Sequence, residues 1–284
     1  RVLAGRAVGL ALGGGGARGF AHIGVIRAME EAGLPIDMVG GTSMGSIIAG
    51  QYAMGRSPEA MIQLNEDIIR IKPFTEYTVP VMSLLRSKRV EQSAKMAFGD
   101  TEIEDLWLPW FGVSCDLATA EMVVHDRGLA WAATRASGAL PGVVLPMLIG
   151  TRVLVDGGVV NNLPGDVMRQ RCRGTVVVVN VSPDEERAFA IGTIPSPWQV
   201  FWSWVLPFRT SISVPSIVQI MMRTATLASA GRARAVERDA DLYLRPPVDH
   251  FGLLEFGRIR AIVDAGHAYA RERLATFLAP AGAP

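Results

Sequence analysis

Residues 8–45 read VGLALGGGGARGFAHIGVIRAMEEAGLPIDMVGGTSMG, and this stretch decides the fold class. Val8–Leu12 is a short apolar run that predicts a buried strand, and four glycines end it. Ala17–Glu31 follows with apolar side chains at threefold spacing, which predicts a helix. Ile36–Gly40 predicts a second strand, and a helix after it runs to about Met54. Two strand–turn–helix units in succession are typical of an α/β fold.

The rest of the chain continues this alternation. Val176–Val181 is a β-branched run suited to the centre of a parallel sheet. Ser57–Pro58 predicts the start of a helix to about Ile71, and Arg258–Phe277 predicts a long C-terminal helix. We therefore expect one α/β domain with a mainly parallel sheet over residues 1–284. Further strands are expected at Phe111–Cys115, Met122–His125 and Arg152–Val155, further helices at Leu129–Ser137 and Pro164–Gln170, and partial helix in 72–105.

Composition excludes several classes of protein. The 284 residues include 28 Lys and Arg against 27 Asp and Glu, so the net charge is +1. Such a chain has no overall field to attract nucleic acid, and we expect no nucleic-acid partner. Hydrophobic residues make up 49% of the chain, which argues against disorder. Two cysteines, Cys115 and Cys172, are too few for a disulfide framework, so a cytoplasmic location is expected.

The N-terminus has no initiator Met and no apolar stretch typical of a signal peptide, so we expect a segment of a longer protein. Residues 188–208 carry no charge, but a glycine and three prolines interrupt them. Their uninterrupted part, 198–206, is too short to cross a bilayer, which favours an interfacial or lid-forming segment. Trp198, Trp202 and Trp204 lie there, and tryptophan favours contact with a lipid surface.

The glycine-rich loop at residues 14–19 reads GGGARG and fits G-x-G-x-x-G between a strand and a helix. A dinucleotide site would also need an acidic residue at the end of the second strand, whereas Asp37 stands at its start. A P-loop would need Lys-Ser or Lys-Thr after the glycines. An oxyanion hole is the interpretation that remains, with backbone N–H donors from Gly14, Gly15 and Gly16. Arg18 is either a cation for a phosphate head group or a solvated charge in the first helical turn.

The second turn is a candidate nucleophile elbow. Gly41-Thr42-Ser43-Met44-Gly45 fits G-x-S-x-G between a strand and a helix. Gly41 and Gly45 allow a sharp turn that lifts the Ser43 hydroxyl above the sheet. On the pattern alone, a serine that caps the next helix is equally expected. The neighbouring glycine loop favours the nucleophile, because both loops fall at the carboxyl ends of adjacent parallel strands.

A serine nucleophile needs a proton acceptor. Asp156 directly follows a predicted strand, and Gly157 and Gly158 after it let another backbone come close. The ordinary meaning of Asp-Gly is a turn, but in a dry site the carboxylate can act as a base. A Ser-His-Asp triad also stays open. Its candidate histidines are His22, His125, His250 and His267.

The motifs GGGARG, GTSMG and DGG, in this order, resemble those of the patatin-like phospholipase family. The resemblance covers about residues 8–275 and includes the longer runs GGGGARGFAHIGV, GGTSMGSIIAG and DGGVVNNLP. Residues 244–249, LRPPVD, with Phe256-Gly257 soon after, resemble the neuropathy target esterase subgroup. Members of that subgroup are lysophospholipases that often carry cyclic-nucleotide-binding modules upstream.

The resemblance implies a three-layer α/β/α fold and a dyad in which Ser43 is the nucleophile and Asp156 its partner. It implies an oxyanion hole at Gly14 to Gly19, with no metal and no cofactor. It also implies a phospholipid or lysophospholipid substrate, peripheral contact with a membrane and an upstream regulatory module. The remaining glycines of the three motifs would support these turns: Gly19, Gly41, Gly45, Gly157 and Gly158.

Acyl chains need an apolar channel, and residues 138–149 and 198–222 are candidates for it, although core packing is the alternative for 138–149. Three alternatives to the dyad hydrolase remain at this point. The first is a triad esterase that uses one of the histidines. The others are a non-catalytic lipid-binding module and a nucleotide-binding regulator.

Overall fold

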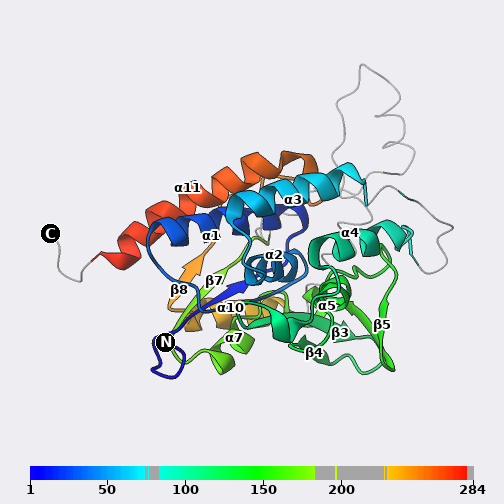
Figure 1. Cartoon of the computed structure of the whole chain (residues 1–284), viewed down its shortest axis with the longest axis horizontal. Helices are drawn as coiled ribbons and strands as arrows, with labels where there is room; N and C mark the ends of the chain where they lie inside the picture. Colours follow the sequence, from blue (N-terminus) through cyan, green and yellow to red (C-terminus); the bar gives the residue numbers. More distant parts are fainter. Residues whose placement is uncertain (74–75, 77–82, 183–195, 197–226, 228, 280–284) are drawn as a thin grey trace, which may run out of the picture.

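The computed structural model describes residues 1–73, 76, 83–182, 196, 227 and 229–279 (Figure 1). Its eight described strands form one sheet in the order β5-β6-β3-β2-β1-β7-β8, and β4 pairs with β3. The strands are β1 Val8–Leu12, β2 Met38–Thr42, β3 Trp110–Asp116, β4 Met122–His125, β5 Met147–Ile149, β6 Arg152–Asp156, β7 Thr175–Val179 and β8 Leu242–Leu244. The helices are η1 Gly16–Phe20, α1 Ala21–Glu31, α2 Met44–Ala53, α3 Pro58–Arg70, α4 Lys88–Phe98, η2 Ile103–Asp105, α5 Ala130–Ser137, α6 Gly158–Asn161, α7 Gly165–Arg171, α10 Ala230–Asp239, η3 Phe256–Arg258 and α11 Ile259–Leu278.

The sheet separates two hydrophobic cores, which confirms the three-layer α/β/α arrangement. Side chains alternate along a strand, so each central strand contributes to both faces. Leu10 and Leu12 of β1 and Val177 of β7 belong to the core under α1, α2, α3 and α11. Ala11 of β1 and Val178 of β7 belong to the core that α7 and α10 cover. In Figure 1 these two groups of helices lie on opposite sides of the sheet.

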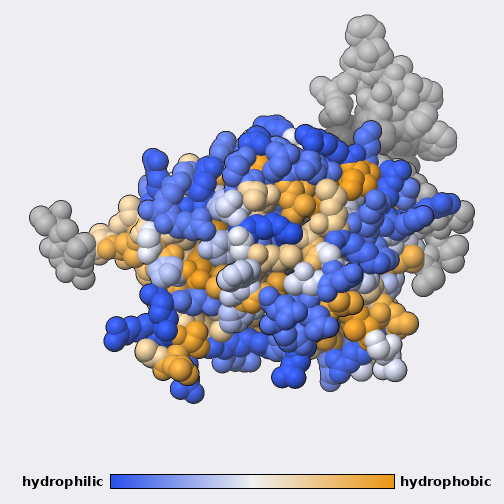
Figure 2. Space-filling model, viewed as in Figure 1, coloured by the Kyte–Doolittle hydropathy of each residue, from blue (hydrophilic) through white to orange (hydrophobic). Residues whose placement is uncertain are grey.

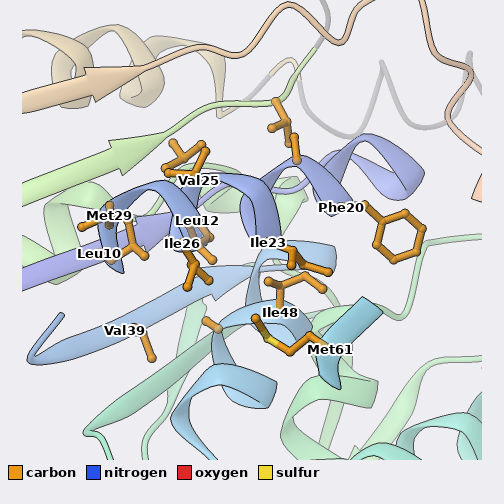
Figure 3. Close-up of a cluster of buried hydrophobic side chains, with 14 of the residues drawn as sticks. Leu10, Leu12, Phe20, Ile23, Val25, Ile26, Met29, Val39, Ile48 and Met61 are labelled. Carbon is orange, nitrogen blue, oxygen red and sulfur yellow. The ribbon is translucent and has the colours of Figure 1, made fainter. Parts of the chain in front are cut away.

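The predicted apolar face of the first helix is buried as expected. Ile23 and Ile26 of α1 are fully buried, as are Ile48 of α2 and Met61 of α3. Figure 3 shows these four side chains together between the helices and the strands. Each such burial contributes about 1.5–3 kcal/mol of hydrophobic free energy. This packing fixes α2, and with it the turn that precedes α2.

The first helix begins later than the sequence predicts. Residues 16–20 form the 3-10 helix η1, and the α-helix starts at Ala21. Two contacts account for the difference. The Ala17 N–H donates to the Leu253 carbonyl, and a Cβ on Gly19 would lie 2.3 Å from Cγ of Met44. The glycine-rich loop is therefore shaped by residues from elsewhere in the chain.

The sheet is mixed. β3, β2, β1, β7 and β8 are parallel neighbours, as predicted, but β4 and β6 run antiparallel to β3, and β5 runs antiparallel to β6. Short connections explain the β3–β4 and β5–β6 pairings, because a parallel crossover needs a dozen or more residues. Only Gly150 and Thr151 join β5 to β6. β2 also begins two residues later than expected, at Met38.

No helix in the part of the chain that the structure describes is both long and apolar enough to cross a membrane. Apart from Ser196, the uncharged segment 188–208 lies outside the described residues. Trp198, Trp202 and Trp204 lie outside them as well, so their proposed contact with lipid stays a prediction.

α1 and α11 pack with their backbones in direct contact. A Cβ on Gly24 would lie 2.0 Å from the Val263 carbonyl oxygen, and one on Gly266 would lie 2.3 Å from the Ala21 carbonyl oxygen. Real Cβ atoms do not approach backbone so closely. Only glycine fits at these two positions, and the pairing holds α11 over the first core.

We predict that Gly266→Ala lowers the free energy of unfolding by about 1–3 kcal/mol, because the added methyl overpacks the α1–α11 contact. Urea denaturation measures this change. The matched control is Gly231→Ala in α10, where an added Cβ meets nothing within 4 Å. There the better helix propensity of alanine should leave stability unchanged or raise it by up to about 1 kcal/mol. Equal stability of both variants would contradict the packing argument.

Candidate active site

Two strands meet head to head along one edge of β3. β2 pairs with Trp110–Val113, and β6 pairs with Ser114–Asp116 in the opposite direction. β4 pairs with Gly112–Cys115 and so overlaps both ranges, which places β4 on the other edge. The last pairs are Thr42 with Val113 and Asp156 with Ser114. The end of β2 therefore lies beside the end of β6.

The turn after β2 has the geometry of a nucleophile elbow. The backbone of Ser43 has φ 54° and ψ −127°. Residues other than glycine rarely adopt a positive φ. The turn is possible because two glycines let β1 come close. A Cβ on Gly41 would lie 2.6 Å from the Leu12 carbonyl oxygen, and one on Gly45 would lie 2.2 Å from it. The strain at Ser43 is held by this close packing.

The structure brings the two predicted catalytic side chains together. Ser43 Oγ donates to Asp156 Oδ2 over 2.7 Å, and the Gly158 N–H donates to Asp156 Oδ1 over 2.7 Å. Asp156 is only 3% exposed. Burial raises the pKa of Asp156 to about 6, although the hydrogen bonds from Gly158 and Ser43 act in the opposite direction. The pair thus consists of a hydroxyl hydrogen-bonded to a buried carboxyl group that is a weaker acid than an ordinary aspartate.

The glycine-rich loop lies beside this pair. A Cβ on Gly14 would lie 3.1 Å from Cβ of Ser43. The Gly14 N–H donates to the Asn162 carbonyl over 3.0 Å, so this amide is used within the fold and differs from the predicted free donor. Asn162 Nδ2 also donates to the Gly14 carbonyl over 3.2 Å. Asn162 is a contributor that sequence reasoning missed, although it stands in the DGGVVNNLP run.

The other loop amides remain as donors. Among the described residues, the N–H groups of Gly15 and Gly16 have no hydrogen-bond acceptor. Met44 begins α2, and the first N–H groups of a helix have no partner inside the helix. The residue after the nucleophile is a common oxyanion donor in such elbows, so Met44 was predictable from GTSMG. The positive end of the α2 dipole also lies here.

Arg18 is anchored within the fold. It is buried, and its Nε donates to the Phe251 carbonyl over 2.8 Å. This bond, with that from Ala17 N–H to the Leu253 carbonyl, ties the glycine-rich loop to the segment 248–254. The interpretation of Arg18 as a solvated charge is wrong, because the side chain is buried, while its role as a cation for a phosphate head group stays a prediction. A Cβ on Gly157 would lie 2.3 Å from the Val113 carbonyl oxygen, so this glycine lets β6 end against β3.

None of the four histidines, all of which the structure describes, bonds to Ser43 or Asp156. His22 Nε2 bonds to the Gly13 carbonyl over 2.8 Å, and His125 Nε2 to Ser114 Oγ over 2.7 Å. Burial lowers the pKa of each of these two to about 4. His250 packs against the Phe251 ring, and His267 bonds to Glu31.

A cavity of about 500 Å³ lies beside the elbow. Met44 and Gly138, which line it, are the neighbours of Ser43 and of Ser137, whose Oγ accepts from the Ser43 N–H. In Figure 1, α3 lies above α2 and α4 lies above α5 around this region. Apolar side chains form most of its wall, among them Ile47, Ile68, Ile69, Val90, Phe98 and Phe256.

The expected channel in 138–149 is mostly core and surface in the structure. Only Gly138 of this segment lines the cavity. Val143 and Val144 pack with Leu85 in a small separate core, while Leu148 is exposed. The cavity wall instead comes largely from α3, α4 and α5. Of these, α4 lies within residues 72–105, for which the sequence predicts only partial helix.

A model of the family described as patatin-like phospholipase matches residues 10–168, more than half of the chain. The chain belongs to the patatin-like phospholipase family. The matched range holds the glycine-rich loop, the elbow and Asp156 of this patatin-like domain.

Curated relatives agree with this assignment. The domain is 38% identical over 280 residues to human "Patatin-like phospholipase domain-containing protein 6", covering 95% of the chain and 20% of that protein. It is 36% identical over 284 residues to "Lysophospholipase NTE1" of Yarrowia lipolytica, covering 96% of the chain and 20% of that protein. The chain thus spans about a fifth of the length of these relatives.

Among solved structures, VipD from Legionella pneumophila matches with a TM-score of 0.50 and 13% identity. The match covers 96% of this chain and 67% of that chain. At this identity the likeness shows the fold alone, and it agrees with the layered sheet described above.

We predict that Asp156→Asn stabilises the protein at pH 8. The folded state raises the pKa of Asp156 from 3.8 to about 6, so it favours the protonated form. Stability therefore falls as pH rises from about 4 to about 6, by about 3 kcal/mol, and a neutral amide avoids this loss. The melting temperature of the variant should exceed that of the wild type at pH 8, and the two should converge near pH 4.

Asp241→Asn is the matched control for this experiment. Burial acts to raise the pKa of Asp241, but hydrogen bonds from the Val176 N–H and from Arg169 outweigh it and lower the pKa. The same substitution there should lower the melting temperature at pH 8. If Asp156→Asn behaves like Asp241→Asn, the account of Asp156 is wrong.

Proposed function

We propose that this patatin-like domain is a serine acyl hydrolase that cleaves fatty-acyl esters of lysophospholipids or phospholipids. The observation that carries the proposal is the 2.7 Å hydrogen bond from the strained Ser43 to the buried Asp156. The names of its relatives, a patatin-like phospholipase and a lysophospholipase, support the same class of reaction. The dyad Ser43–Asp156 performs it by acyl transfer in two steps.

In the first step Ser43 Oγ attacks the ester carbonyl carbon, and its proton passes to Asp156 Oδ2. The carbonyl oxygen becomes an oxyanion, which the N–H groups of Gly15, Gly16 and Met44 are proposed to stabilise. One oxyanion donor is typically worth about 3 kcal/mol. When the tetrahedral intermediate collapses, the ester bond breaks, and the leaving alcohol takes the proton from Asp156.

In the second step water attacks the acyl-Ser43 carbonyl carbon and gives its proton to Asp156. Collapse of this intermediate breaks the bond to Ser43, returns the proton to Oγ and releases the fatty acid. Asp156 accepts a proton only when ionised, and its pKa of about 6 places the base form at neutral pH. A base with a pKa near the working pH is an efficient one.

The cavity beside the elbow is the proposed site of the acyl chain. Its volume of about 500 Å³ is within the range of ligand pockets, and its wall is mostly apolar. Met44 places one end of it next to the nucleophile. A carbonyl at Ser43 would then have its alkyl chain among α3, α4 and α5.

The alternatives are less well supported. A triad esterase needs an imidazole on the serine, whereas each histidine has another neighbour. A dinucleotide site needs a free carboxylate at the end of β2, but Asp37 stands before β2 and accepts from the Val8 N–H over 2.8 Å. A non-catalytic lipid-binding module has no need of a strained serine bonded to a buried carboxyl group.

We propose that the domain meets its substrate at a membrane surface. Figure 2 shows hydrophobic side chains gathered where Figure 1 places β5. Leu148 and Val153 are cross-strand partners with exposures of 65% and 38%, and Leu117 next to Val153 is 59% exposed. Exposed apolar side chains that cluster in this way are typical of lipid or protein contacts. An upstream regulatory module stays a prediction.

We predict that Ser43→Ala lowers the rate of lysophosphatidylcholine hydrolysis by at least about 1,000-fold, because the nucleophile is gone. The variant should also lose fluorophosphonate labelling. Asp156→Asn should lower kcat by at least about 100-fold, since the proton acceptor is lost. Released fatty acid measures turnover. His125→Ala, His250→Ala and His267→Ala are the controls and should keep turnover near the wild-type level. Loss of turnover in one of them would favour a triad.

We predict that the double variant Leu117→Ser, Leu148→Ser binds phosphatidylcholine vesicles less than the wild type. Each leucine that moves from water into the membrane contributes about 1.5–3 kcal/mol to binding. Co-sedimentation measures the bound fraction. Hydrolysis of a short-chain, monomeric lysophospholipid should be unchanged. Leu3→Ser, at a fully exposed residue near the N-terminus, is the control. Equal binding by the double variant and the wild type would overturn this membrane contact.

A further inference from the structure

The hydroxyl of Ser137 joins the nucleophile to the sheet. The Ser43 N–H donates to Ser137 Oγ over 2.9 Å, and Ser137 Oγ donates to the Val113 carbonyl over 2.6 Å. Ser137 is the last residue of α5 and is fully buried. Its single oxygen therefore bridges two backbone groups, one on the elbow and one on β3.

The bridge fills a gap that the elbow creates. The pairing of β2 with β3 ends at Thr42 and Val113, because the chain turns away from β3 at Ser43. The Ser43 N–H and the Val113 carbonyl then need another partner, and an unpaired buried backbone group is costly. A hydroxyl both accepts and donates, so one serine satisfies both groups. An alanine there would satisfy neither.

The same turn holds the other member of the dyad. The Asp156 N–H donates to the Ala139 carbonyl over 2.9 Å, two residues beyond Ser137. The segment Ser137–Ala139, which we call the α5 brace, is therefore hydrogen-bonded to the backbone amides of both Ser43 and Asp156. Those amides carry the side chains that form the 2.7 Å Oγ–Oδ2 contact.

We infer that Ser137 is a positioning residue for the hydrolysis, and that the α5 brace sets the separation of Ser43 and Asp156. This inference rests on the proposed function of the dyad. The contribution of Ala139 comes from its carbonyl and survives substitution of its side chain, so Ser137 is the residue that can be tested. Ser137 touches no substrate in this account and acts only through Ser43.

The test is Ser137→Ala, with kcat expressed per site labelled by a fluorophosphonate so that unfolded protein is not counted. A displacement of about 1 Å at a reacting group can cost about 100-fold, so we expect kcat to fall by roughly 10- to 100-fold with KM little changed. Ser83→Ala is the matched control. Ser83 is also a buried serine, and its hydroxyl donates to the Leu85 carbonyl over 2.8 Å rather than to the elbow or β6. It should show a similar fall in urea midpoint but wild-type kcat.

The pH profile separates positioning from a general loss of stability. The Ser43 hydrogen bond lowers the pKa of Asp156, so a displaced Ser43 should move the acid limb of kcat/KM to higher pH. Ser83→Ala should leave this limb in place. Ser137→Cys keeps a weak donor and acceptor at the same position and should give a kcat between those of the wild type and Ser137→Ala.

Failure of this inference differs from failure of the proposed function. If Ser43→Ala is inactive but Ser137→Ala and Ser137→Cys keep wild-type kcat and an unmoved acid limb, the brace is wrong and the dyad stands. If Ser83→Ala loses kcat as much as Ser137→Ala, the effect is general and the brace is again overturned. Retained turnover in Ser43→Ala would instead reject the proposed function.

Discussion

One edge of β3 is shared by two strands that approach from opposite directions, and the candidate active site depends on this arrangement. β2 occupies the first half of the edge and β6 the second, so their ends meet at Val113 and Ser114. Ser43 leaves the sheet at this junction and Asp156 arrives at it. A fully parallel sheet would not bring the two together, since β6 reaches the junction by running antiparallel to β3.

Burial gives the carboxyl group at this junction its chemical character. Water cannot stabilise the charge of Asp156, so its pKa rises to about 6, and the ionised form costs folding free energy at neutral pH. The same burial makes the carboxylate a stronger proton acceptor than an exposed aspartate. Strain at Ser43 is a second such cost, held in place by the contact of Gly41 and Gly45 with β1. The ionised Asp156 and the strained Ser43 thus both lower the free energy of unfolding of the domain.

Sequence reasoning found the parts of this site that depend on local patterns. The strands β1 and β2, the elbow and the strand-end aspartate were visible because short runs with glycine determine them. It could not find contacts that depend on distant segments. Phe251 and Leu253 shape the glycine-rich loop, and Ser137 completes the β2–β3 ladder. The hydrogen bond from the Gly14 N–H to the Asn162 carbonyl is another such contact between distant segments.

The most direct test is a crystal structure of the domain after reaction with a fluorophosphonate. We expect phosphorus bonded to Ser43 Oγ, its oxygen within hydrogen-bond distance of the Gly15 or Gly16 N–H, and the Asp156 carboxylate as the only ionisable side chain at the adduct. An adduct on another residue, or an imidazole bonded to Ser43 Oγ, would contradict the account.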